Sequence, residues 1–223
     1  MIWKGLLFLW LAAGMVAGFL WAPVVPVLGG TTRVFYFHFP AALVTTIAFA
    51  WSMIHSALYL ARRDLGHDDH AAGAAELGLM FCVVATISGS MWARAMWGAY
   101  WNWDPRETSI FFLLLIYAAY LALRAAIDGE ERRARLAAIY SCAAFVAVPF
   151  LIFVVPRIYF SLHPDPLFGR RGKPDIDPRI MLVATWMLIG FTALFFWLLS
   201  LRVRLGRVER ARPEEGGLEA AAR

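Results

Sequence analysis

The segment that decides the fold runs from Trp97 to Ile127 and reads WGAYWNWDPRETSIFFLLLIYAAYLALRAAI. From Pro105 onward it stays predominantly apolar for more than twenty residues, enough to cross about 30 Å of hydrocarbon as a helix. Asp104 at the N-cap, Pro105 at the first helical position and Glu107 two residues later predict a capping-box start for that helix. An aromatic-rich segment therefore leads directly into a membrane span.

The rest of the chain repeats this apolar pattern. Of its 223 residues, 61% are hydrophobic and 17% charged, which exceeds what one soluble domain of this size could bury. We expect an all-α, polytopic integral membrane protein with six transmembrane helices. The predicted spans are Ile2–Ala22, His38–Ala61, Glu76–Met96, Pro105–Ile127, Leu136–Pro156 and Pro178–Leu201. The apolar run after Lys4 is longer than the h-region of a signal peptide.

Lysine and arginine counts predict the orientation. One set of connecting segments, with both termini, holds 13 of the 21 Lys and Arg residues, and the other set holds 8. The richer set is expected in the cytoplasm, which places both termini inside and the segments 23–37, 97–104 and 157–177 outside. Basic cytoplasmic loops account for the pI of about 9.6, so nucleic acid is not an expected partner. We predict a transmembrane domain at 1–201, a basic cytoplasmic tail at 202–223, and short, charged, solvated inner loops, one of them at 62–73.

The outer segment is unusually rich in tryptophan. Trp92, Trp97, Trp101 and Trp103 place four of the ten tryptophans within twelve residues. An aromatic belt at the membrane surface is the ordinary explanation for such residues. Their density, and a glycine at position 98 that lets a flat molecule approach the backbone, favour a ligand platform. If 97–104 is helical, one face of this short amphipathic platform carries Trp97, Tyr100, Trp101 and Asp104.

Two histidines lie on the same predicted side. His38 stands at the outer end of the second span and His163 in the third outer segment. Neutral imidazoles from two segments suit axial ligation of heme iron, and the aromatic platform suits the macrocycle. His55 lies about 25 Å further along the second span, and we expect it to be structural or solvated, like His67 and His70.

Three arginines lie outside against the positive-inside trend, namely Arg33, Arg106 and Arg157. Lipid head groups would explain any one of them. Heme propionates would explain why they stand beside the histidines, through charge-assisted hydrogen bonds. The run Arg170–Lys173 is expected to contact lipid or a partner protein.

With these residues in place, the chain resembles the heme-handling proteins of cytochrome c biogenesis that carry a tryptophan-rich motif. Within them it is most similar to the branch of cytochrome c maturation protein C, the heme exporter protein C family. The resemblance rests on YFHFPAA at 36–42, WGAYWNWDPRETS at 97–109 and SLH at 161–163. Tyr100, where that branch usually has Trp, and the Pro105 and Glu107 pattern resemble the longer synthetase branch instead.

The resemblance implies a heme-binding export protein of the cytoplasmic membrane. It implies that His38 and His163 hold the iron of heme b and that the segment from Trp97 through Gly98, Trp101 and Trp103 to Asp104 cradles the ring. The implied partners are a periplasmic heme-carrier chaperone, a small single-span membrane protein and an ATP-driven membrane export complex. The chain itself has no GxxxxGK[ST] loop, so ATP hydrolysis would belong to another protein.

Two other functions fit the same residues. A heme lyase or synthetase component would act on apocytochrome c and would co-purify with it. A membrane electron carrier with bis-histidine heme would be expected to hold its cofactor inside the helical bundle and to cycle with quinol. The residues favour binding and delivery over an enzymatic reaction.

Overall fold

The computed structural model describes residues 2–163 and 176–211, and this part of the chain contains helices and no strand. Residues 164–175, which are part of the third predicted outer segment and include the predicted contact run Arg170–Lys173, and residues 212–223 lie outside the described residues. The elements are α1 (Ile2–Val16), η1 (Ala17–Trp21), η2 (Gly29–Val34), α2 (Phe35–Arg62), α3 (Leu65–Trp97), α4 (Pro105–Ala126), α5 (Glu130–Pro149), η3 (Phe150–Val154), α6 (Val155–Ile158) and α7 (Pro178–Ala211).

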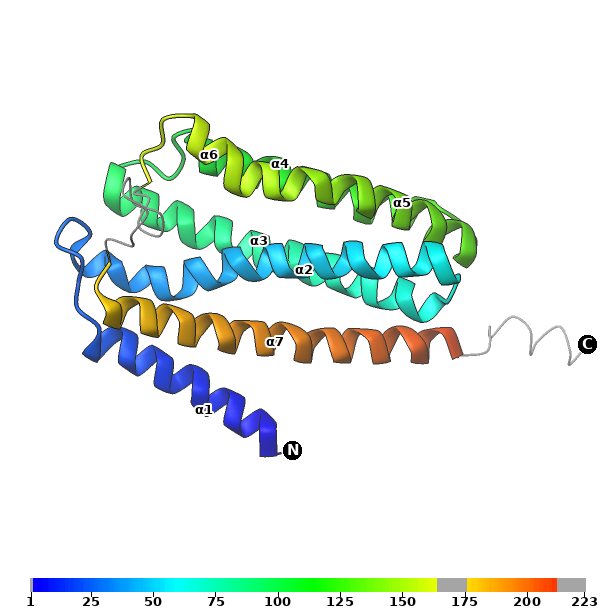
Figure 1. Ribbon diagram of the computed structural model, residues 1–223, viewed down its shortest axis with the longest axis horizontal. Coiled ribbons are helices and arrows are strands. Elements are labelled where there is room, and N and C mark those ends of the chain that lie inside the picture. The colour runs from blue at the N-terminus through cyan, green and yellow to red at the C-terminus, as the bar shows by residue number, and fades with distance from the viewer. Residues whose placement is uncertain (1, 164–175, 212–223) are drawn as a thin grey trace, which may run out of the picture.

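The six predicted spans are confirmed. Six helical stretches are long and apolar enough to cross a membrane: 2–21, 29–62, 65–97, 105–126, 130–158 and 178–208. In Figure 1, α2 and α3 form a central antiparallel pair, with α4 and α5 on one side and α7 followed by α1 on the other. The connections α1–α2 and α3–α4 lie at one end of the molecule, and α2–α3 and α4–α5 lie at the other, toward which the start of α1 and the end of α7 are directed.

Two core clusters join these layers. One packs Ala41 and Val44 of α2 with Phe81 of α3 and Phe195 of α7. The other joins α2 to the α4–α5 side, where the Phe49 and Tyr117 rings stack with centroids 3.3 Å apart. By contrast α1 packs mainly on α7 and keeps a broad apolar face exposed, as expected of a helix that contacts lipid.

The predicted inner loop at 62–73 is wrong. Only Arg63 and Asp64 connect α2 to α3, and Asp64 caps α3 by accepting from the Gly66 backbone N–H at 2.8 Å. Asp68 and Asp69 in this stretch pair with arginines of other helices. Asp68 is 4% exposed and accepts from Arg124 Nη1 at 2.6 Å and Nη2 at 2.8 Å. Charged residues that form ion pairs between helices are compatible with a helix. The polarity of this stretch was therefore not evidence for a loop.

The last helix extends beyond the predicted span. Helix α7 continues to Ala211, ten residues beyond Leu201. Arg202 pairs with Glu76 of α3 at 2.6 Å, and Arg210 pairs with Asp69 of α3 and Glu130 of α5. Because these carboxylates belong to neighbouring helices, the basic stretch is held as helix against the bundle.

Candidate functional site

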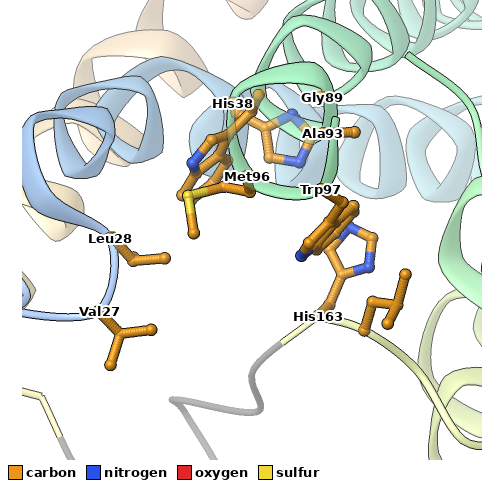
Figure 2. A pocket seen from close by; sticks show the side chains of 10 residues that line it. Val27, Leu28, His38, Gly89, Ala93, Met96, Trp97 and His163 are labelled. Carbon is orange, nitrogen blue, oxygen red and sulfur yellow. The ribbon is translucent and has the colours of Figure 1, made fainter. Parts of the chain in front are cut away.

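A cavity lies at the end of the bundle that carries the tryptophan-rich segment. It has a volume of about 610 Å³, within the range of about 300–1,000 Å³ typical of small-molecule and cofactor sites. An adjoining space of about 200 Å³ shares the side chains of His38, Trp92 and His163 with it. The lining is mostly apolar, with Phe35, Phe39, Leu43, Trp101 and Ile152 among its residues. Figure 2 shows His38 and His163 on different segments beside the smaller of these two spaces.

The environment of His38 sets which ring nitrogen carries its proton. Its Nδ1 lies 3.0 Å from the carbonyl oxygen of Ala85 and 3.2 Å from Ser88 Oγ. The Ser88 hydroxyl proton has the Val84 carbonyl as its partner at 2.7 Å. A carbonyl can only accept, so Nδ1 of a neutral His38 donates to Ala85, and Nε2 keeps its lone pair. Donation of the other ring N–H to a carbonyl is the usual arrangement of a metal-binding histidine.

Helix α3 makes room for this ring at Gly89. A Cβ atom there would lie 2.7 Å from His38 Cε1, closer than non-bonded carbons approach. Trp92, one turn further along α3, packs edge-on to His38 with centroids 5.8 Å apart and donates from Nε1 to Thr31 Oγ1 at 3.0 Å. Gly89 and Met96 were not among the residues predicted to form the site. Their spacing at 89, 92 and 96, on one face of a helix, was the available signal.

Asp104 holds the second histidine. Its side chain accepts from His163 Nδ1 at 2.9 Å and from Ser161 Oγ at 3.0 Å, both at Oδ1, and from the Leu162 backbone N–H at 2.7 Å at Oδ2. Because the carboxylate accepts from Nδ1, a neutral His163 also keeps its lone pair on Nε2. A carboxylate–histidine pair of this kind orients a ring for binding a metal.

The same carboxylate begins α4. Asp104 Oδ1 accepts from the Arg106 backbone N–H at 2.9 Å, while Glu107 Oε2 accepts from the backbone N–H groups of Asn102 at 2.7 Å and Asp104 at 3.3 Å. The predicted capping box is therefore confirmed. One side chain, 4% exposed, both starts a membrane span and positions His163.

The charges at this pair follow from its surroundings. Burial alone would raise the pKa of Asp104, but backbone hydrogen bonds from Arg106 and Leu162 and the nearby His163 hold that pKa below its ordinary value. Burial lowers the pKa of His163, with Asp104 opposing the shift and Arg106 adding to it. At neutral pH the pair is a carboxylate and a neutral imidazole.

The tryptophan-rich segment does not form the short helix that its spacing suggested. Helix α3 ends at Trp97, and Gly98 takes a left-handed conformation with φ of 81° that terminates it. Trp97 packs edge-on to His163 with centroids 4.7 Å apart, and Trp101 lines the larger cavity. Tyr100 and Trp103 are 60% and 66% exposed and are not among the cavity-lining residues. Because α3 ends at Trp97 and the backbone has positive φ at Gly98 and Trp103, the aromatic side chains of this segment do not share one helical face.

The three outer arginines separate in the same way. Arg106 and Arg157 line the larger cavity. Arg33 does not line either space: its Nη1 donates to the carbonyls of Gly18 at 2.5 Å and Ala22 at 2.7 Å. These carbonyls end the first span, so Arg33 caps that helix.

The site thus combines two histidines with free Nε2 lone pairs, tryptophans and two arginines at one end of a six-span helical bundle. Such a set of side chains, in a six-span membrane protein, is chemically suited to a planar, anionic, metal-containing ligand. A family model described as heme exporter protein C matches residues 1–216. The chain belongs to the heme exporter protein C family, which assigns it to heme transport and cytochrome c-type biogenesis as a multi-pass protein of the cytoplasmic membrane.

Individual relatives carry the same name. The chain is 34% identical to the heme exporter protein C of Bradyrhizobium diazoefficiens over 75% of this chain and 63% of that protein, less than two thirds of its length. It is 31% identical to that of Rhodobacter capsulatus, over 87% of this chain and 80% of the relative. For the Escherichia coli protein the identity is 30%, over 91% and 82%.

Proposed function

We propose that the chain binds heme b in the larger cavity, with His38 Nε2 and His163 Nε2 as the two axial ligands of the iron. The observation that carries this proposal is the hydrogen bonding of both Nδ1 atoms, to Ala85 O and to Asp104 Oδ1. In each ring the remaining nitrogen is the one with a lone pair, as iron ligation requires. One ligand lies on a membrane-spanning helix and the other on a segment held by a single carboxylate.

Other residues of the site would hold the ring. Trp97 and Trp101 would contact the macrocycle, and Trp92 would keep the His38 ring in place. Arg106 and Arg157 would pair with the propionates through charge-assisted hydrogen bonds. Arg33 is better explained by its bonds to the end of η1.

The bound heme would then be passed to a periplasmic heme-carrier chaperone. The charge bias supports an arrangement with both termini in the cytoplasm and the cavity at the periplasmic surface. Delivery there would suit a carrier that approaches from the periplasm, assisted by a small single-span protein and an ATP-driven export complex. The exposed apolar face of α1 is a surface that lipid can cover.

An absorption spectrum of the purified chain, with and without added carrier, tests this function. We expect a b-type, low-spin heme whose amount falls when apo-carrier is added. Absence of specific heme binding would contradict the proposal. Stable co-purification with apocytochrome c and no transfer to a carrier would instead favour a lyase component.

A further inference from the structure

Three histidines gather at the opposite end of the bundle, far from the proposed heme site. His55 lies in the last two turns of α2, and His67 and His70 lie in the first two turns of α3. The two-residue turn at Arg63–Asp64 folds α3 back on α2 and brings them together. The sequence suggested only structural or solvated side chains at these positions.

Two of the rings face each other through their nitrogens. His55 Nδ1 and His67 Nδ1 are 3.2 Å apart. Two imidazole nitrogens, each about 2.0–2.1 Å from one ion, are separated by about 2.9 Å at a right angle and about 3.3 Å at a tetrahedral angle, so the observed spacing lies within the range for two ligands on one metal. Both side chains are half-buried, which leaves the pair within reach of ions from solution.

Neighbouring rings hold His55 in this position. His70 stacks on it with centroids 4.6 Å apart at 24°, and Trp51 packs against it at 5.0 Å. Asp69 and Arg207 are the charged groups that interact electrostatically with His70, and Asp69 is itself paired with Arg210. Among the described residues no group of three His, Cys, Asp or Glu side chains is arranged to hold one ion, so the pair would be completed by water.

We propose that His55 and His67 form a two-imidazole chelate for a late first-row divalent ion, Ni²⁺ or Cu²⁺, with His70 buttressing the His55 ring. Imidazole suits these ions, whereas Mg²⁺ and Ca²⁺ prefer oxygen. An ion held there joins the end of α2 to the start of α3. Because it binds the folded hairpin only, it raises the melting temperature of the protein as its concentration increases.

The test is a calorimetric titration of the full chain in lipid nanodiscs with Ni²⁺, in a His38→Ala/His163→Ala background that removes the outer ligands. We expect one saturable site, tighter for Cu²⁺ than for Ni²⁺ and not competed by Mg²⁺. His67→Gln can keep the hydrogen bond to His55 without an imidazole, and it should weaken Ni²⁺ binding at least tenfold. His70→Phe retains the stacked ring and should bind Ni²⁺ within about threefold of the background.

Paramagnetic resonance of bound Cu²⁺ gives a second measurement in the same background protein. Hyperfine coupling to two imidazole nitrogens is expected. The proposal is overturned by unchanged Ni²⁺ affinity in His67→Gln, by lack of a saturable site in the background protein, or by fewer than two coordinated nitrogens. These results are independent of heme, since the outer histidines are absent throughout.

Discussion

Replacing Asp104 by Asn should weaken heme binding at the proposed site while leaving α4 in place. Asn caps helices as well as Asp does, so the start of the span is retained. The difference arises at the other acceptor contacts. In wild type the Leu162 N–H donates to Asp104 Oδ2 at 2.7 Å. If the Asn oxygen takes the place of Oδ1, the amide N–H₂ takes the place of Oδ2, so the Leu162 N–H faces a donor and loses its acceptor. If the amide is flipped, N–H₂ faces His163 Nδ1 and drives the ring proton onto Nε2.

The first orientation displaces the segment that carries His163, and the second places a proton on His163 Nε2, the nitrogen that would bind iron. Loss of such an orienting partner typically lowers metal affinity about 10- to 100-fold, or roughly 1.4–2.8 kcal/mol. We therefore expect Asp104→Asn to raise the heme Kd by this factor in an absorption titration of protein in nanodiscs, with a diminished low-spin bis-imidazole spectrum.

Asp177→Asn is the matched control. Asp177 caps α7 by accepting from the Arg179 backbone N–H at 2.8 Å, and it does not line the cavity. Its substitution should leave the heme Kd within about twofold of wild type. The reasoning is refuted if Asp104→Asn binds heme as wild type does, or if the two variants lose affinity equally.

Four further predictions concern neighbouring residues. His38→Ala and His163→Ala should each abolish the bis-histidine spectrum and regain it with added imidazole, whereas His55→Ala should retain it; retention in all three would refute the ligand assignment. Gly89→Ala places a Cβ 2.7 Å from His38 Cε1 and should weaken heme binding at least tenfold, while Gly5→Ala, which meets nothing within 4 Å, should not. Trp97→Ala should reduce heme loading more than Trp103→Ala, because Trp103 is 66% exposed; equal effects would argue for a general role of the segment. Arg106→Gln should lower heme affinity by about 1.5–3 kcal/mol and bind an esterified heme as wild type does, whereas Arg33→Gln should instead lower the melting temperature, since Arg33 caps η1.

The spans were predictable from the sequence because each is a long apolar run, and length and hydropathy suffice to identify such helices. The capping box was predictable for a similar reason, since Asp104, Pro105 and Glu107 act over a few adjacent residues. The start of α3 at Leu65 and the end of α7 at Ala211 were not predictable in this way. Asp68 and Arg202 read as loop or tail residues until their partners on other helices are known, and those partners lie 56 and 126 positions away.

The same distinction between local signals and long-range contacts applies to the site. Residue type and topology placed His38 and His163 at one end of the bundle, and they line one cavity. The bond between Asp104 and His163 joins segments 59 residues apart, so the sequence indicated a helix cap and a place in the ring-cradling segment for that aspartate but not its bond to the histidine. The different fates of Trp101 and Trp103 likewise depend on backbone angles after Gly98, including φ of 57° at Trp103, which helical spacing does not anticipate.

The hydrogen bonds at the two Nδ1 atoms also determine the proton balance of heme capture. Ligands such as thiols must give up a proton when they bind a metal, so their loading depends on pH. Here Ala85 and Asp104 keep the ring protons on the far side of each imidazole before heme arrives. Neither Nε2 has a proton to release, so under the proposed ligation these two rings would take up the iron without releasing a proton on either side of the membrane.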